Sequence, residues 1–193
     1  DDAPTPDRAP GAGGDEPTVR SATPRERFAV ETRLALGEWY AGRRFGIVVD
    51  AIRRARTLET GGADCEDRTW RLPPATVLVV AGLRVKNIAT RPQRPPDATD
   101  VAAIVGDRVA DPVDSVPHPD ASVPLHCASV GLPGEHLPPG PAATPADLPS
   151  GAVSSWWFGA VLPEGTAASA VEVGYDAPSP PPYEVRWVAP DGS

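Results

Sequence analysis

At 193 residues the chain is long enough for one domain with a hydrophobic core, or for a smaller domain with a tail. Its net charge of −8, with acidic residues spread along the sequence, argues against a nucleic-acid ligand because no basic stripe is present to neutralise phosphates. No apolar run reaches the roughly 20 residues of a transmembrane helix, and 26 prolines and 18 glycines predict short elements instead of long helices.

The first part of the chain, residues 1–27, is rich in proline, glycine and aspartate and offers little apolar surface to bury. We expect a flexible leader or linker there, followed by one folded domain over residues 28–193. The opening "DDAPTPDRAPGAGGDEPT" is typical of a mature N-terminus after removal of a signal peptide, so we expect an exported protein, extracellular or at the cell surface. A lipid anchor upstream of Asp1 is compatible with that expectation. Lys86 is the only lysine, a bias that a GC-rich genome or adaptation to high salt, as in haloarchaea, would explain.

The first predicted strand covers residues 28–36, where apolar and polar side chains alternate. One side of it carries Phe28, Val30, Thr32, Leu34 and Leu36. A helix stays open as an alternative, because Glu, Arg, Leu and Ala are good helix formers. A second strand is predicted over residues 44–51, and "TLETGGADCEDR" at 57–68 is interpreted as a polar turn region.

A longer strand is predicted over residues 77–86. Its first half is apolar on both sides and its second half is amphipathic, which is typical of a central sandwich strand with one covered end. Asn87, the only asparagine, ends this strand. There its side chain can bond to the neighbouring backbone in a turn.

The second half of the chain contains a long proline-rich interval and then three further strands. Residues 111–150 are interpreted as a loop that wraps over a sheet edge, because proline cannot join the interior of a β-ladder. Strands are predicted at 153–160, 170–175 and 183–189, with a turn at Pro163–Gly165. Together these elements predict an all-β, antiparallel sandwich.

Three pieces in this order resemble the immunoglobulin-like domains of secreted bacterial and archaeal lipoproteins, a largely uncharacterised family related to the mycobacterial secreted immunoprotective antigen. The pieces are "LGEWYAGRRFGIVVDAIRRA", "ATVLVVAGLRVKNIATRP" and "SSWWFGAVLPEGTAASAVEVGY". The resemblance covers residues 36–189. It implies an immunoglobulin-like β-sandwich, and it transfers no catalytic residue. The chain departs from the family in its extended N-terminal segment and in the proline-rich wrapping loop at 111–150.

Cys65 and Cys127 are the only cysteines, and in an exported chain they predict one disulfide. Two buried free thiols remain the alternative.

Two groups of side chains contain residues that could bind a metal ion. His118, His126 and His136 lie close to Cys127 in the sequence, so a metal or an electron-transfer site is one hypothesis; surface histidines beside a disulfide are the other. A blue-copper site is disfavoured because the chain has no methionine and the Cys–His spacing is too long. Calcium could be held by loop aspartates, but a solvated acidic surface explains them better. These aspartates are Asp97, Asp100, Asp107, Asp111 and Asp114.

No nucleophile elbow or phosphate-binding loop is present in the sequence, so we predict a non-enzymatic protein without a cofactor. Trp156, Trp157 and Phe158 are consecutive, so in a strand they must face both sides of a sheet; Trp187 adds a fourth large aromatic side chain. One side fills the core. The other is covered by the chain itself or by a neighbouring molecule.

Two functions are therefore expected. The first is a scaffold or binding role at the cell surface, with a protein partner or self-association. The second is a subunit of an extracellular filament or surface layer, in which residues 28–36 insert as a donor strand into the sheet of the next copy.

Overall fold

The computed structural model describes residues 32–42, 44–96, 101–105, 108–132, 147–166, 168–175 and 183–189. The leader, Phe28, Val30 and His136 lie outside these residues, as do Asp97, Asp100 and Asp107. The same holds for residues 133–146 of the proline-rich interval.

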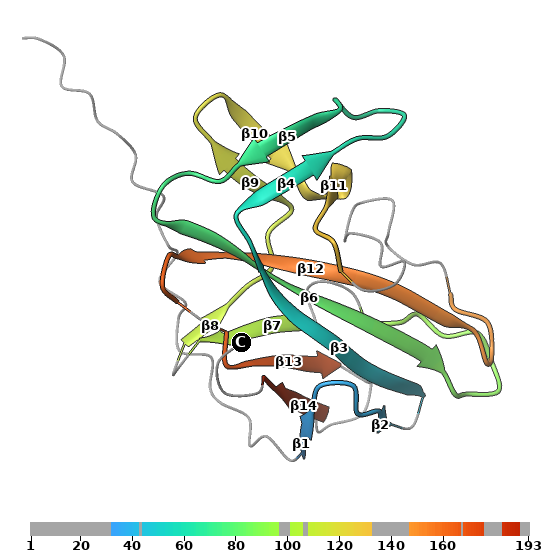
Figure 1. Cartoon of the computed structure of the whole chain (residues 1–193). Helices are drawn as coiled ribbons and strands as arrows, with labels where there is room; N and C mark the ends of the chain where they lie inside the picture. The colour runs from blue at the N-terminus through green and yellow to red at the C-terminus, as the bar shows by residue number, and fades with distance from the viewer. Residues whose placement is uncertain are drawn as a thin grey trace, which may run out of the picture.

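A four-stranded antiparallel sheet crosses the middle of the molecule (Figure 1). Its strands, in order across the sheet, are β12 (Val153–Pro163), β6 (Thr76–Asn87), β3 (Phe45–Ala55) and β2 (Tyr40–Ala41). The central position of β6 and the strand at β12 confirm the sequence prediction. β6 is apolar on both faces over most of its length because both faces of this sheet are covered there.

A five-stranded sheet packs against one face of the four-stranded sheet (Figure 1). Its strands, in order, are β1 (Thr32–Ala35), β14 (Tyr183–Val188), β13 (Ala170–Tyr175), β7 (Val101–Val105) and β8 (Arg108–Ala110). All neighbours are antiparallel except β1 and β14, which run parallel. The core between the two sheets includes Val49, Leu83, Phe158, Ala103, Val171 and Trp187. The chain is therefore a β-sandwich, as its strand pattern predicts.

A smaller third layer covers one half of the opposite, outer face of the four-stranded sheet. It consists of β11 (Ala128–Ser129), β4 (Thr57–Thr60) and β5 (Arg68–Arg71), the hairpin β9 (Ser115–His118)–β10 (Ala121–Pro124), and the 3₁₀ helix η2 (Leu125–Cys127). A second hydrophobic cluster joins Leu58, Trp70, Val116, Val123 and Leu125 of this layer to Leu78, Val80 and Trp157 of the sheet. Among the described residues, no helix is long and apolar enough to cross a membrane.

This layer corrects two predictions. Residues 57–68 are not only a turn, because Thr57–Thr60 form a strand that buries Leu58. The described start of the proline-rich interval is not a loop along a sheet edge, because residues 115–124 form a two-stranded hairpin. Pro117 and Pro124 fit this hairpin because its ladder is only two strands wide, which leaves edge positions open.

The consecutive aromatic residues divide between the two cores. Trp156 and Phe158 point into the sandwich, whereas Trp157 points into the third layer and is 2% exposed. Both faces of β12 are therefore covered by the chain itself at this position. Trp187 is fully buried, and its indole Nε1 donates a hydrogen bond of 2.8 Å to the carbonyl oxygen of Glu38, which ties β14 to the loop between β1 and β2.

The end of β6 is fixed by the side chain of Asn87, which is fully buried. Its Oδ1 accepts a hydrogen bond from the Ala89 amide at 2.9 Å, the local turn contact that the sequence predicts. Its Nδ2 also donates to the carbonyl oxygens of Arg91 and Leu148, at 2.8 and 2.7 Å. Asn87 thus joins the loop after β6 to the segment that leads into β12.

Replacing Asn87 with alanine should lower the free energy of unfolding by about 2–4 kcal/mol, because it removes the three hydrogen bonds of a buried side chain. Asn87→Asp should cost more, since a carboxylate would face the same two carbonyl oxygens. Urea unfolding followed by tryptophan fluorescence measures both changes. Lys86→Ala, at the exposed neighbouring position, is the control and should change stability by less than about 0.5 kcal/mol. Equal losses for Lys86→Ala and Asn87→Ala would contradict this role.

Candidate functional site

A disulfide joins Cys65, in the loop between β4 and β5, to Cys127, at the end of η2. The Cα atoms of the two residues are 5.8 Å apart, within the usual range for a bonded pair. The bond fastens the β4–β5 loop to η2 and β11 in the third layer. The predicted pairing of the two cysteines is what the structure shows.

His126 lies directly beside this bond. One ligand atom from each of Cys65, His126 and Cys127 falls within 4.8 Å of the others. This is the one convergent group of three metal-ligating side chains among the described residues. It differs from the predicted set of three histidines, because it takes Cys65 from a distant part of the chain and leaves out His118.

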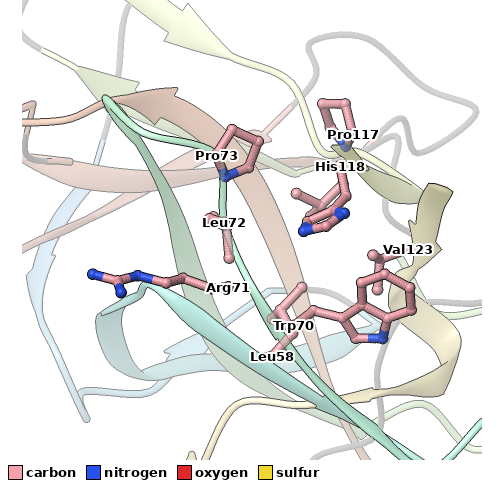
Figure 2. A pocket seen from close by; sticks show the side chains of 9 residues that line it. Leu58, Trp70, Arg71, Leu72, Pro73, Pro117, His118 and Val123 are labelled. Carbon is pink, nitrogen blue, oxygen red and sulfur yellow. The ribbon is translucent and has the colours of Figure 1, made fainter. Parts of the chain in front are cut away.

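His118 has a packing role in β9. Its ring meets the indole of Trp70 edge-on, with the ring centroids 5.1 Å apart and an angle of 75° between the planes (Figure 2). The surrounding side chains from β4, β5 and the β9–β10 hairpin leave a shallow depression without room for a water molecule. The depression is therefore a packing contact between two parts of the third layer, not a ligand pocket. Neither Asp111 nor Asp114 joins a convergent group of three metal-ligating side chains within the described part of the chain.

Trp70 holds the edge of the third layer together. Its Nε1 donates to Thr60 Oγ1 at 2.9 Å, and the Arg68 guanidinium lies 4.0 Å from the centre of its ring. A cation over an indole face stabilises by about 0.5–1 kcal/mol at an exposed site. His118 packs on this indole, and its Nδ1 accepts a hydrogen bond from the Asp120 amide at 3.2 Å, so contacts within the layer account for its position.

The other half of the outer face of the four-stranded sheet is not covered by the third layer. We call it the Trp39 surface, and it is made of Trp39, Asp50, Arg84, Lys86, Val153 and Ser155. Cross-strand register places Val153 beside Lys86 and Ser155 beside Arg84 on this face. Trp39 is 43% exposed and Val153 is 51% exposed, so the surface presents apolar groups to solvent.

A bidentate ion pair between Arg84 and Asp50 lies on this surface. Arg84 Nε and Nη2 donate to the two carboxylate oxygens of Asp50 at 2.7 and 2.6 Å. The hydrogen bond that Arg84 donates to the Asp50 carboxylate raises the pKa of the guanidinium above its ordinary value. The same guanidinium lies 5.3 Å from the centre of the Trp39 ring. Arg84 therefore holds the exposed indole on one side.

The Trp39 indole lies against the sheet at Gly46. A Cβ atom at this position would lie 3.4 Å from the Trp39 ring, which is an ordinary contact distance. Trp39 is not among the residues predicted above to form a site. The sequence does contain a pattern that fits this contact: in "LGEWYAGRRFG" the tryptophan precedes a glycine of the next strand by seven residues. This spacing indicates an aromatic ring packed over a glycine only when the pairing of the strands is known.

Comparisons with known proteins give three solved structures and no family. No family model and no curated protein matches the chain. An uncharacterised β-sandwich protein from Clostridium difficile is 8% identical with a TM-score of 0.46, and the match covers 86% of this chain and 99% of that one. The yjhA protein from Bacillus subtilis is 13% identical with a TM-score of 0.48, covering 81% of this chain and 99% of that one. A conserved hypothetical protein from Bacillus anthracis is 12% identical with a TM-score of 0.46, covering 72% and 87% of the two chains. Because these sequence identities and TM-scores are low, the fold is defined here by the strand pairing given above.

Proposed function

We propose that the chain is an exported, non-enzymatic β-sandwich domain with a binding or scaffold role outside the cell or at its surface. The observation that carries this proposal is the Cys65–Cys127 disulfide, because such bonds form and persist in oxidising compartments. The resemblance of its strands to immunoglobulin-like domains of secreted lipoproteins supports the finer assignment to that class.

The Trp39 surface supports a protein partner. Tryptophan and arginine are the residues that most often dominate binding energy at protein interfaces, and here they are held together by an ion pair at the sheet surface. Lys86 adds an exposed positive charge in a chain whose net charge is −8. The partner that fits is a protein with an apolar anchor for the indole and an acidic group for Lys86.

The compartment is tested by the oxidation state of the cysteines in the cells that produce the chain. Free thiols are alkylated in intact cells, and thiols released later by reduction are labelled with a heavier reagent and measured by mass spectrometry. We expect the peptides with Cys65 and Cys127 to carry the heavier label and to appear in the surface or secreted fraction. Recovery in the cytoplasmic fraction with both thiols free would contradict the proposal.

Binding through the Trp39 surface is tested by photo-crosslinking on intact cells. A photoreactive residue at position 39 should form an adduct with one protein, and Val153→Glu, which puts a carboxylate on the same surface, should reduce that adduct about tenfold or more. The matched control is a photoreactive residue in place of Val188, which is 40% exposed on the other sheet. Equal adducts at both positions, or none at position 39, would contradict this surface as the interface.

A filament role has one supporting observation. β1 is a four-residue edge strand, and its parallel pairing with β14 is the exception in an otherwise antiparallel sheet. In the structure Thr32 and Leu34 pair within their own chain, and Leu36 packs against the sandwich core. Strand donation therefore requires that this segment exchange between copies. Electron microscopy in high salt should show filaments that disappear when residues 1–36 are removed. Monodisperse particles in both samples would exclude assembly by strand donation.

A further inference from the structure

We propose that the chain, once its disulfide is reduced, binds a zinc ion through Cys65, His126 and Cys127. The site is separate from the Trp39 surface and does not depend on the proposed binding role. The affinity of the third layer for zinc would then depend on its redox state. The oxidised form does not bind the metal, and the reduced form does.

The three residues are placed close to the arrangement that a zinc site requires. Zinc bonds to thiolate sulfur at about 2.3 Å and to imidazole nitrogen at about 2.0–2.1 Å in tetrahedral geometry, which places ligand atoms roughly 3.5–3.8 Å apart. The three ligand atoms already lie within 4.8 Å of one another. Once the disulfide is open, rotation of the two cysteine side chains separates the sulfurs to that spacing. The Cα atoms, 5.8 Å apart, need little movement.

Backbone contacts hold these residues in place without the disulfide. The Gly61 amide donates to the Cys127 carbonyl oxygen at 3.1 Å, and Ala128 pairs with Thr60 in the ladder between β11 and β4. On the other side, the Cys65 amide donates to the Gly62 carbonyl oxygen at 3.2 Å. The ligand frame is therefore defined by hydrogen bonds that reduction does not remove.

Exposure favours an exchangeable site. His126 is exposed and Cys65 is partly exposed, while Cys127 is buried against the third layer. The imidazole is thus accessible from solvent, and three protein ligands leave the fourth position of a tetrahedral zinc ion to water. Structural zinc sites are closed by four protein ligands, whereas open sites take three.

The redox step balances with a dithiol reductant. The dithiol gives two electrons and two protons to the disulfide, which yields the thiols of Cys65 and Cys127 and leaves the reductant as its own disulfide. Zinc then displaces both thiol protons as it forms two zinc–thiolate bonds, so binding releases protons and strengthens with rising pH. Because the bound thiolates are withdrawn from exchange, zinc should slow re-formation of the disulfide.

The experiment titrates the full chain with zinc against a chromophoric chelator, without oxygen and after the reductant is removed. We expect one zinc ion per reduced chain and none per oxidised chain. His126→Ala should weaken binding to the reduced form about tenfold or more, and Cys65→Ser should abolish it. His118→Ala is the matched control, since His118 lies in the same layer outside the group, and its affinity should equal that of the wild type.

A second measurement separates a folded site from binding to unfolded thiols. Zinc should raise the unfolding midpoint of the reduced wild type and leave that of the oxidised protein unchanged, because a ligand stabilises the state that binds it. Zinc that binds more tightly in denaturing urea, or that lowers the midpoint, would overturn the proposal. Equal zinc affinity of wild type and His126→Ala, or of the oxidised and reduced forms, would overturn it as well.

Discussion

Trp157→Ala is expected to lower the free energy of unfolding by about 3–5 kcal/mol, the usual cost of truncating a buried tryptophan. Trp157 is 2% exposed and belongs to the cluster that joins β12 to the third layer. The third layer is built of short strands, and Trp157 is the largest of the sheet side chains buried against it. The loss should therefore fall mainly on the attachment of this layer, with the sandwich core affected less.

Urea unfolding gives the total loss for Trp157→Ala, and amide hydrogen exchange shows where it falls. We expect faster exchange in β4, β5 and the β9–β10 hairpin than in β13 and β14. The control is Val153→Ala, on the same strand and the same face but 51% exposed, which should change stability by less than about 0.5 kcal/mol. Uniform acceleration across both sheets would show that the third layer is not a separate cooperative part.

Removing both cysteines, as Cys65→Ala with Cys127→Ala, should cost about 4 kcal/mol in free energy of unfolding. The cysteines are 62 residues apart, and in the chain-entropy model a closed loop of this size restricts the unfolded state by about that amount. The loss should appear mainly as a less stable folded protein with an unchanged fold, because the β11–β4 pairing remains.

Chemical denaturation of the double variant and of the reduced wild type measures this effect in two independent ways. Both should lose a similar amount, and the near-ultraviolet circular dichroism of the folded proteins should match that of the oxidised wild type. Ser122→Ala with Ser115→Ala removes an exposed side-chain hydrogen bond in the same layer and is the control, with an expected loss below about 1 kcal/mol. A loss below about 1 kcal/mol in the cysteine variant would show that the unfolded chain is little restricted by the bond.

The sequence was sufficient for most of the long strands, although β3, predicted over 44–51, continues to Ala55. β6 and β12 carry continuous apolar runs because they are covered on both faces, and β13 and β14 lie where residues 170–175 and 183–189 are predicted as strands. Such strands can be recognised from neighbouring residues alone. A strand buried on one face has apolar residues at every second position, and a strand buried on both faces has a continuous apolar run. The single disulfide could also be predicted from the sequence, because the chain has only two cysteines.

The third layer was missed because its strands lack that local signal. β4 and β9 bury little more than one side chain each, Leu58 and Val116, among polar, glycine and proline residues that read as turns. A strand of four residues becomes stable only when neighbouring elements supply its pairing and its apolar contacts. Its existence is therefore a property of the packed molecule.

The sequence by itself determined the β class, the central position of β6 and the turn at Asn87, because each depends on residues that are close together in the chain. Only the tertiary structure decided which contacts form across long separations. These are the hydrogen bond from Asn87 to Leu148, the approach of His126 to the Cys65–Cys127 bond, and, among the described residues, the half-face around Trp39 that the third layer does not cover. No local period encodes such contacts, since they depend on strand register and on how far one layer extends over another.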